Sequence, residues 1–274
     1  MTSKIWFVTG ISRGFGKALA DELLRRGHVV VGTTRNGSSL EPQKDLIELA
    51  LDVSDEQQSG DAIAQAIARV GRIDVVVNNA GFGLVGAVEE VSTEEARKVF
   101  ETNFFGTWNV IRAALPYLRA NRSGHIVNFS SIGGITGSIG NGLYNASKFA
   151  VEGLSEALEL EVKPFGVTVT IVEPGYFRTD FLSPSSIRKA AKILDVYEET
   201  AGVMRQAALT RSGTQTGDPA RAVAVIIDAI ESGAPPLRLP LGADAFARIA
   251  GKISRLEKEM DQWRDAASAT EFAS

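Results

Sequence analysis

Hydrophobic positions along the chain fall into two alternating kinds of segment. Short runs of consecutive apolar residues predict strands covered on both faces, at residues 4–10, 28–34, 46–53, 72–81, 124–131, 166–175 and 235–242. Between them, apolar residues recur every three or four positions, which predicts helices at 16–27, 54–71, 92–124, 142–162 and 220–233. Strands that alternate with helices in this way form parallel sheets joined by right-handed crossovers. The pattern predicts an α/β fold, a doubly wound parallel sheet of about seven strands flanked by helices.

Two helix starts carry the residues of a capping box. Ser54 is followed three residues later by Gln57, and Ser92 is followed by Glu95. In such a box the hydroxyl and the longer side chain each bind a backbone N–H group of the first turn. We therefore predict that helices begin directly after Ser54 and Ser92.

Two segments do not follow the alternation. Residues 181–217 are long for a connection and hold Ser, Pro and Gly near both ends of a helical patch, so we predict a helical lid over the substrate site. Residues 244–274 begin as an amphipathic helix whose apolar positions are Phe246, Ile249, Ile253, Leu256 and Met260. Because its polar face mixes both charge signs, we predict that this tail packs against the domain or the lid and not on a membrane. No linker divides the chain, so residues 1–274 are predicted to form one domain.

Composition narrows the class of protein. The 274 residues are 44% hydrophobic and 23% charged, with a formal net charge of −4, which is ordinary for a soluble protein and gives no basic surface for nucleic acid. The chain has no cysteine, which excludes disulfides, thiol nucleophiles and thiolate metal sites. The two histidines, His28 and His125, both enter predicted strands, so we assign them structural roles and predict no metal site. Without a signal-peptide pattern or an apolar run of membrane length, we expect a cytoplasmic protein that binds neither membrane nor nucleic acid.

The turn after the first strand holds the first candidate chemistry. Its sequence, TGISRGFG, places Gly10, Gly14 and Gly16 between a predicted strand and a predicted helix. Glycines at such a turn let a pyrophosphate approach the backbone while helix N–H groups point at it. The alternative is a tight turn without a ligand. The strand before it and the helix after it favour a dinucleotide site, and so a Rossmann-type sheet.

The end of the second predicted strand bears on the choice between NAD and NADP. Folds that bind NAD often place a carboxylate there, where it binds the ribose hydroxyls. This chain has Thr34 and Arg35 at that position and no acid. A guanidinium pairs with a 2′-phosphate, and Arg13 in the glycine turn would add a second positive charge. NADP(H) is favoured and NAD(H) stays possible, since both arginines have the alternative of being solvated surface residues.

Seven short motifs follow one another along nearly the whole chain. They are TGISRGFG, LDV at 51–53, NNAG at 78–81, TN at 102–103, SS at 130–131, YNASK at 144–148 and PGYFRT at 174–179. Each is weak alone, but in this order, on the expected strands and loops, they closely resemble the short-chain dehydrogenase/reductase family. The C-terminal half resembles the branch of that family that contains steroid- and retinol-type reductases.

The resemblance implies roles for individual residues. The predicted catalytic residues are Asn103, Ser131, Tyr144 and Lys148, with Ser130 as the less favoured neighbour of Ser131. The predicted cofactor-binding residues are Gly10, Ser12, Arg13, Gly14, Phe15, Gly16, Thr34, Arg35, Asp52, Val53, Asn79, Ala80, Gly81, Tyr144, Lys148, Pro174, Gly175, Phe177 and Thr179. Asn103 matches the family's helix asparagine, which supports a water-linked proton path to the lysine.

Carbonyl chemistry gives this set of residues an independent rationale. Reducing a carbonyl needs a hydride at carbon and a proton at the forming alkoxide. A free tyrosine titrates near ~10, so it is a poor base for the reverse reaction. Lys148 lies one helical turn after Tyr144, and with the oxidised nicotinamide it is expected to lower the pKa of that tyrosine. Ser131 would bind the substrate oxygen where charge develops.

The substrate pocket is predicted to be mainly apolar. Its predicted residues are Ser131, Phe82, Ile135, Leu143, Tyr176 and Phe181, with Leu84 and Val85 beside them. Each apolar member has the alternative of belonging to the core. Because no cluster of arginines or lysines is visible among them, we expect a small hydrophobic ketone, aldehyde or secondary alcohol as substrate.

Assembly and two other functions stay open. Because relatives commonly assemble through the helices at 92–124 and 142–162, we expect a homodimer or homotetramer. The chain could instead be an epimerase or dehydratase on the same scaffold, although those relatives usually carry a larger separate substrate domain. It could also be a non-catalytic NADP-binding sensor, although such relatives usually lose the tyrosine or the lysine, and both are present here.

Overall fold

A parallel sheet of seven strands forms the centre of the structure, a computed structural model that describes residues 3–37, 42–183, 186–210 and 213–272. The strand order is β3-β2-β1-β4-β6-β7-β9. The strands are β1 (Ile5–Thr9), β2 (Val29–Thr34), β3 (Leu46–Ala50), β4 (Val75–Asn78), β6 (Gly124–Phe129), β7 (Val167–Pro174) and β9 (Arg238–Leu241). All seven lie within segments predicted from the sequence, and the Rossmann-type doubly wound sheet is confirmed.

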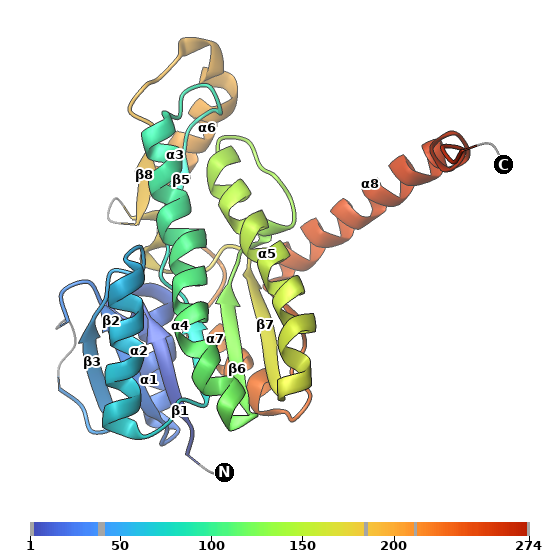
Figure 1. Ribbon diagram of the computed structural model, residues 1–274. Coiled ribbons are helices and arrows are strands. Elements are labelled where there is room, and N and C mark those ends of the chain that lie inside the picture. Colours follow the sequence, from blue (N-terminus) through green and yellow to red (C-terminus); the bar gives the residue numbers. More distant parts are fainter. Residues whose placement is uncertain (1–2, 38–41, 184–185, 211–212, 273–274) are drawn as a thin grey trace.

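Helices cover both faces of this sheet (Figure 1). On one face pack α2 (Glu56–Val70), α4 (Gly106–Asn121) and α5 (Gly142–Val162), and on the other α1 (Gly14–Arg25) and α7 (Pro219–Glu231). Each face has its own apolar core. Neighbouring residues of one strand enter opposite cores, as Phe7 and Trp6 do, because side chains of a strand alternate between its faces. The strands therefore read as continuous apolar runs.

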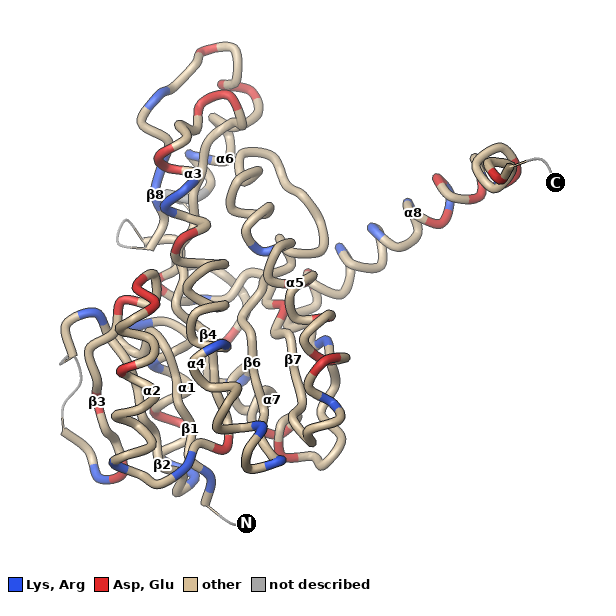
Figure 2. The backbone as a smooth tube through the Cα atoms, in the orientation of Figure 1, with Lys and Arg blue, Asp and Glu red and all other residues tan. Residues whose placement is uncertain are grey.

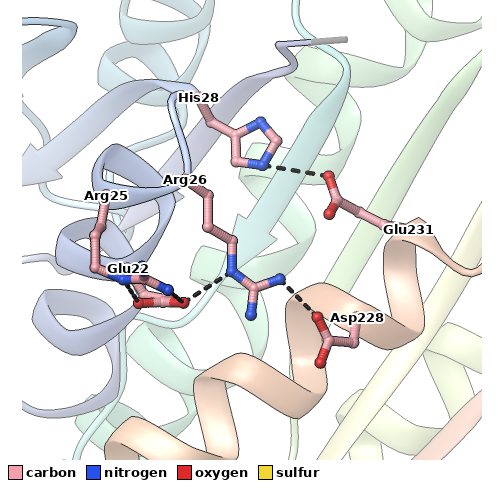
Figure 3. Close-up of polar contacts among 6 residues, drawn as sticks. All are labelled: Glu22, Arg25, Arg26, His28, Asp228 and Glu231. Atoms are coloured by element: carbon pink, nitrogen blue, oxygen red, sulfur yellow. Dashed lines mark hydrogen bonds and ion pairs between the residues drawn. The ribbon is translucent and has the colours of Figure 1, made fainter. Parts of the chain in front are cut away.

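Charged side chains join α1 to α7 at the surface (Figure 3). Glu22 binds Arg25 and Arg26, and the Nη1 atom of Arg26 lies 2.6 Å from Oδ1 of Asp228 on α7. Arg25 and then Arg26 lower the pKa of Glu22 to about 2. The network fixes the two helices on this face beside the first strand.

Both histidines make buried contacts at the amino ends of strands, His28 directly before β2 and His125 in the second position of β6. The Nε2 atom of His28 lies 3.2 Å from Oε1 of Glu231, as drawn in Figure 3. The Nε2 atom of His125 lies 2.9 Å from Oγ1 of Thr170, and burial lowers the pKa of His125 to about 4. Within the described parts of the chain, no group of three His, Cys, Asp or Glu residues is arranged to hold a metal ion.

The predicted start of the second helix is wrong by one residue. α2 begins behind Asp55, whose carboxylate accepts a hydrogen bond from the backbone N–H of Gln58 at 3.0 Å. The expected box of Ser54 and Gln57 does not form, because the hydroxyl of Ser54 donates to Asp52 at 2.7 Å instead. A carboxylate next to the hydroxyl provides the stronger acceptor for the helix N-terminus.

The predicted helix at 92–124 consists of three consecutive segments. These are α3 (Thr93–Phe100), the π-helix η1 (Glu101–Phe105) and α4. Ser92 and Glu95 form the predicted capping box. The π-helical turn contains Asn103, and π-helical turns often occur at functional sites.

The segment 181–217 is only partly helical. Its helices are the end of η4 (Asp180–Leu182), η5 (Asp195–Tyr197), the π-helix η6 (Glu198–Gly202) and α6 (Val203–Thr210). The helical patch predicted within it begins instead with β8 (Ile187–Lys189), which pairs in parallel with β5 (Gly83–Val85) because β5 offers an open edge for backbone hydrogen bonds. Residues 184–185 and 211–212 of this segment lie outside the described residues.

A buried ion pair fastens this segment to the loop that follows β5. The Nη1 atom of Arg205, on α6, lies 2.6 Å from Oε2 of Glu90, which is 1% exposed. Glu90 also accepts hydrogen bonds from the backbone N–H groups of Ala87 and Leu194. These bonds satisfy the buried carboxylate and fix the segment above the sheet.

The C-terminal tail is one long helix, α8 (Ala243–Ser268), which projects away from the domain (Figure 1). Its first turn is held in place, since Oδ2 of Asp244 accepts a hydrogen bond from the backbone N–H of Tyr176 at 2.9 Å. From Ile253 to Phe272 every residue is exposed. The predicted packing against the domain therefore holds only for the first two turns, where Ala245 is buried, and is wrong from Ile253 on, because the straight helix leaves the domain surface there. Among the described residues, no helix is long and apolar enough to span a membrane.

Candidate active site

A cavity of about 790 Å³ lies at the carboxyl ends of the central strands. The order of the sheet reverses between β1 and β4, which is where ligands bind in doubly wound sheets. The glycine turn after β1 lines one part of the cavity, and the start of α5 lines another. Residues of the 181–217 segment, among them Phe181 and Met204, close its remaining side.

The three glycines of the turn between β1 and α1 are required by backbone conformation or by close packing. Gly10 and Gly14 have φ angles of +72° and +58°, which favour glycine. A Cβ atom on Gly16 would lie 2.2 Å from the carbonyl oxygen of Gly10. Arg13, the N-cap residue of α1, makes no side-chain capping hydrogen bond to the helix. A bare backbone at a helix N-terminus fits a pyrophosphate group.

The NNAG turn is bound to this glycine turn. The side-chain amide of Asn79 donates to the carbonyl oxygens of Thr9, at 2.8 Å, and Gly10, at 3.0 Å. The backbone N–H groups of Asn79 and Ala80 both donate to Oγ1 of Thr9 at 3.0 Å. The ends of β1 and β4 therefore form one rigid wall of the cavity.

The ends of β2 and β3 form the wall on the other side of the glycine turn. Arg35 lines the cavity and is exposed, and Arg13 lines it as well. The hydroxyl of Thr34 donates to Oε1 of Glu48, on β3, at 3.3 Å. Glu48 itself does not line the cavity, whereas Asp52 does. Near this wall the carboxylate that faces the cavity thus comes from the loop after β3 and not from the end of β2.

Tyr144 lies near the start of α5 and is 9% exposed. Its ring centroid is 5.7 Å from that of Phe181. Burial raises the pKa of Tyr144 to about 12, and a hydrogen bond with Ser131 acts in the opposite direction. From the sequence we expected a lowered pKa for Tyr144, because that expectation included the positive charges of Lys148 and of an oxidised nicotinamide. In the protein alone the direction is reversed, because loss of hydration outweighs the hydrogen bond.

Lys148 lies one turn further along α5 and is buried. Its ammonium donates to the carbonyl oxygen of Phe129, at the end of β6, at 2.7 Å. Burial lowers the pKa of Lys148 to about 8, while Glu152 acts in the opposite direction. The lysine is therefore mostly charged at neutral pH, one helical turn from the phenol.

Asn103 is completely buried and does not line the cavity. Its Oδ1 atom accepts from the backbone N–H of Phe82, and its Nδ2 atom donates to the carbonyl oxygen of Phe82, both at 3.0 Å. Nδ2 also donates to Oγ of Ser147, at 3.1 Å. The side chain thus holds Phe82 against α5 next to Lys148. The water-linked proton path through Asn103 stays a prediction.

Most residues predicted from the sequence meet in this cavity. Those that line it are Gly10, Ser12, Arg13, Gly14, Phe15, Thr34, Arg35, Asp52, Val53, Asn79, Ala80, Gly81, Phe82, Ser131, Tyr144, Lys148, Pro174, Gly175, Tyr176, Phe177, Thr179 and Phe181. Gly16, Asn103, Ile135 and Leu143 do not. Leu143 packs into a small core cluster with Leu84 and Val99, because it precedes Tyr144 on the helix and points to another side. Ile135 follows the short helix after Ser131 and is only partly buried.

Comparison with known proteins identifies the family of the chain. The sequence model described as short chain dehydrogenase matches residues 4–190. The chain belongs to the short-chain dehydrogenase family. A 3-ketodihydrosphingosine reductase of Bacteroides thetaiotaomicron is 39% identical, covering 96% of this chain and 97% of the relative. Human retinol dehydrogenase 8 is 34% identical, with coverages of 84% and 79%.

Solved structures of short-chain dehydrogenases share the fold. One from Streptomyces avermitilis is 40% identical and superposes with a TM-score of 0.92, covering 99% of this chain and all of that one. Structures from Burkholderia phymatum and Burkholderia cenocepacia are complexes with NAD and NADP, at 22% and 25% identity and TM-scores of 0.82 and 0.71. They cover 96% and 99% of this chain, and 95% and 98% of their own. This short-chain dehydrogenase is an oxidoreductase that depends on a nicotinamide cofactor.

Several basic side chains line the cavity although the sequence did not predict them there. Arg188, on β8, lies over the ring of Phe82, with its guanidinium carbon 5.5 Å from the ring centroid. Lys98 and Arg248 also line the cavity. The expectation that the substrate pocket has no basic residues nearby is therefore wrong. No local pattern could have found Arg188 and Arg248, because their positions follow from the β5–β8 pairing and from the direction of α8.

Two buried glutamates share one arginine behind Lys148. The Nη2 atom of Arg238 lies 3.3 Å from Oε2 of Glu152, and its Nε atom lies 3.4 Å from Oε1 of Glu173. Glu173 is fully buried, and burial raises its pKa to about 7; Glu152 raises it further, and Arg238 lowers it. Burial also raises the pKa of Glu152. The dehydrogenase therefore holds a carboxyl group that titrates near neutral pH inside its core.

We expect Glu173→Gln to stabilise the protein more as the pH rises. Because the folded pKa of about 7 exceeds the ordinary value of 4.5, the folded state binds more protons between these values, and wild-type stability falls as the pH rises through them. Glutamine does not titrate. By calorimetry, the Tm of the variant minus that of the wild type should increase by at least about 2 °C between pH 5 and pH 8, or roughly 1 kcal/mol for a domain of this size.

Glu156→Gln is the matched control, because Glu156 binds the same arginine from an exposed position. Its Tm difference from the wild type should be nearly constant over the same pH range. A Glu173→Gln difference that is equally constant would contradict the raised pKa.

Proposed function

We propose that this short-chain dehydrogenase reduces a hydrophobic ketone or aldehyde, or oxidises the corresponding alcohol, with NADP(H) as the favoured cofactor and Tyr144 as the general acid and base. One observation carries the proposal. A single continuous cavity is lined by the glycine turn, by Ser131, by Tyr144 and by Lys148. The glycine turn would hold the pyrophosphate of a dinucleotide, and Ser131, Tyr144 and Lys148 would face its reactive end.

The chain supplies the proton chemistry. The cofactor, when bound at the glycine turn, supplies the hydride for the carbonyl carbon. Tyr144 donates its phenolic proton to the carbonyl oxygen, and its pKa of about 12 keeps it protonated and ready as an acid at neutral pH.

Ser131 and Lys148 stabilise the charges that this step creates. The hydroxyl of Ser131 donates a hydrogen bond to the substrate oxygen, where negative charge develops. The ammonium of Lys148 offsets the charge of the tyrosinate that remains after the transfer. Its hydrogen bond to Phe129 fixes the ammonium at the end of β6. Both groups are held by the fold before substrate arrives, so little reorganisation is needed.

Apolar side chains around Tyr144 support a hydrophobic substrate. The cavity wall there includes Phe82, Val85, Phe181, Ile187 and Met204. Two relatives are named for 3-ketodihydrosphingosine and for retinol, which supports the same class of substrate. The 181–217 segment provides three of these side chains, in keeping with its proposed role as a lid.

Arg13 and Arg35 support NADP(H). Both line the cavity near the end of β2, where a guanidinium pairs with the 2′-phosphate and a carboxylate would repel it. We expect Arg35→Asp to lower the ratio of kcat/KM with NADPH to that with NADH by at least about tenfold, or roughly 1.4 kcal/mol. Steady-state kinetics with both cofactors measures this ratio.

Lys17→Asp is the control for the change in charge, because Lys17 lies on α1, pairs with Asp21 and does not line the cavity. Its ratio should stay close to that of the wild type. A wild-type enzyme that prefers NADH, or an Arg35→Asp ratio equal to the wild-type ratio, would rule out the NADP assignment.

An assay of cofactor oxidation tests the proposed reaction. The purified enzyme is offered aromatic, alicyclic, steroid and long-chain aliphatic carbonyl compounds, with NADPH and NADH in parallel. We expect consumption of NADPH with at least one hydrophobic class and none with short charged keto acids. Turnover confined to the charged compounds would contradict the proposed substrate class.

The proposal extends to assembly and location. The outer sides of η1, α4 and α5 expose the aromatic residues Phe105, Trp108, Tyr117 and Phe149. These side chains support the expected homodimer or homotetramer, since large exposed apolar patches often mark interfaces. We propose a cytoplasmic location.

A further inference from the structure

The apolar residues of α8 form a strict heptad repeat. Their spacing alternates between three and four residues: Phe246, Ile249, Ile253, Leu256, Met260 and Trp263. From Lys252 on, the positions that flank this stripe hold charged residues, namely Lys252, Glu257, Glu259 and Arg264, whereas the first heptad is flanked by Ala245 and Ala250. A helix that packs on a globular surface usually has a broader apolar side, whereas a narrow stripe of this kind is the seam of a coiled coil.

This stripe is exposed to solvent. Phe246 is 60% exposed, Ile253 51%, Leu256 41%, Met260 65% and Trp263 61%, whereas Ile249 is partly buried near the domain. Exposed apolar surface of this extent usually marks an interaction site. A helix of this kind also gains most of its stability from packing of its apolar side, which the single chain does not provide.

We propose that α8 pairs through this stripe with α8 of a second copy of the chain. The flanking charges suit such pairing. In a parallel pair, Lys252 faces Glu257 of the second copy, and Glu259 faces its Arg264. In an antiparallel pair, Lys252 faces Glu259 of the second copy. The helix is thus complementary to itself in charge as well as in its apolar seam.

The charges of α8 favour a second copy over a membrane surface. Figure 2 shows both signs interspersed along the helix. Residues 243–268 hold five basic residues, Arg248, Lys252, Arg255, Lys258 and Arg264, and five acidic residues, Asp244, Glu257, Glu259, Asp261 and Asp265. Helices that bind anionic membranes carry an excess of basic residues on the polar face. α8 has no such excess of basic residues. The proposed pairing of α8 does not depend on the proposed reaction.

The oligomeric state of two matched variants tests the pairing. Leu256→Glu with Met260→Glu places two charges in the seam. Ser254→Glu with Gln262→Glu places the same two charges on the opposite side of the helix. Sedimentation equilibrium over a range of protein concentrations gives the mass of the full-length wild type and of both variants. Circular dichroism and NADPH binding show that each variant is folded.

We expect the seam variant to have half the mass of the wild type, and the control variant to keep the wild-type mass. Halving is expected whether the wild type is a dimer or a larger assembly with a second interface. The proposal is overturned if the wild type is monomeric throughout, if the folded seam variant keeps the wild-type mass, or if the control loses mass equally. Wild-type protein that stays monomeric but sediments with anionic vesicles would also overturn it.

Discussion

Replacing Tyr144 with phenylalanine is expected to lower kcat for carbonyl reduction by about 10³-fold, within the range that a positioned proton donor contributes. The substitution removes only the hydroxyl and keeps the ring that packs against Phe181. The binding constant for NADPH should stay within about twofold of the wild type, since the glycine turn and Lys148 are untouched. Stopped-flow reduction and a fluorescence titration with NADPH measure the two quantities.

Tyr176→Phe is the matched control, since Tyr176 lines the same cavity from the loop after β7. It should reduce kcat far less than Tyr144→Phe does. Normal turnover by a folded Tyr144→Phe variant would remove Tyr144 from the mechanism, and a loss of NADPH binding equal to the loss of turnover would give it a structural role.

Replacing Lys148 with methionine is expected to lower kcat by about 10²-fold. Methionine fits a buried position but provides no ammonium to offset the tyrosinate. The pH profile should change as well. Because the pKa of Lys148 is about 8, the wild-type ammonium is lost as the pH rises through that value, so the rate of reduction should fall. The variant lacks this titration, so its rate should be flat between pH 7 and pH 9.

Lys163→Met is the control, since Lys163 is exposed beyond the far end of α5. It should keep both the wild-type rate and the wild-type decrease with pH. A Lys148→Met variant whose rate still falls around pH 8 would assign that titration to another group.

Features that depend on short stretches of sequence could be predicted. The seven strands of the sheet are short apolar runs, and the five inner strands are largely buried, so each is visible without knowledge of its neighbours. The glycine turn is similar, because the conflict of a Cβ at Gly16 with Gly10 lies within one turn. The cavity residues Tyr144 and Lys148 are one helical turn apart, so their common side follows from helix geometry alone.

Features that depend on distant segments could not be predicted. The strand β8 exists because β5, about 100 residues earlier, offers it an edge, and Arg188 reaches the cavity for that reason. Leu143 was misplaced because its neighbours in the core cluster come from other elements. The direction of the Tyr144 pKa follows from burial by the whole fold, and the exposure of α8 follows from the angle at which it leaves β9.

The most direct test of the account is to follow hydrogen from the cofactor to the product. The enzyme is given NADPH in which both hydrogens of the reactive nicotinamide carbon are deuterium, with the hydrophobic carbonyl compound that supports the fastest cofactor oxidation. The account predicts an alcohol with one deuterium on its carbinol carbon, formed in equal amount to the NADPH consumed. An alcohol without deuterium, or no alcohol with any hydrophobic carbonyl compound although NADPH binds, would contradict it.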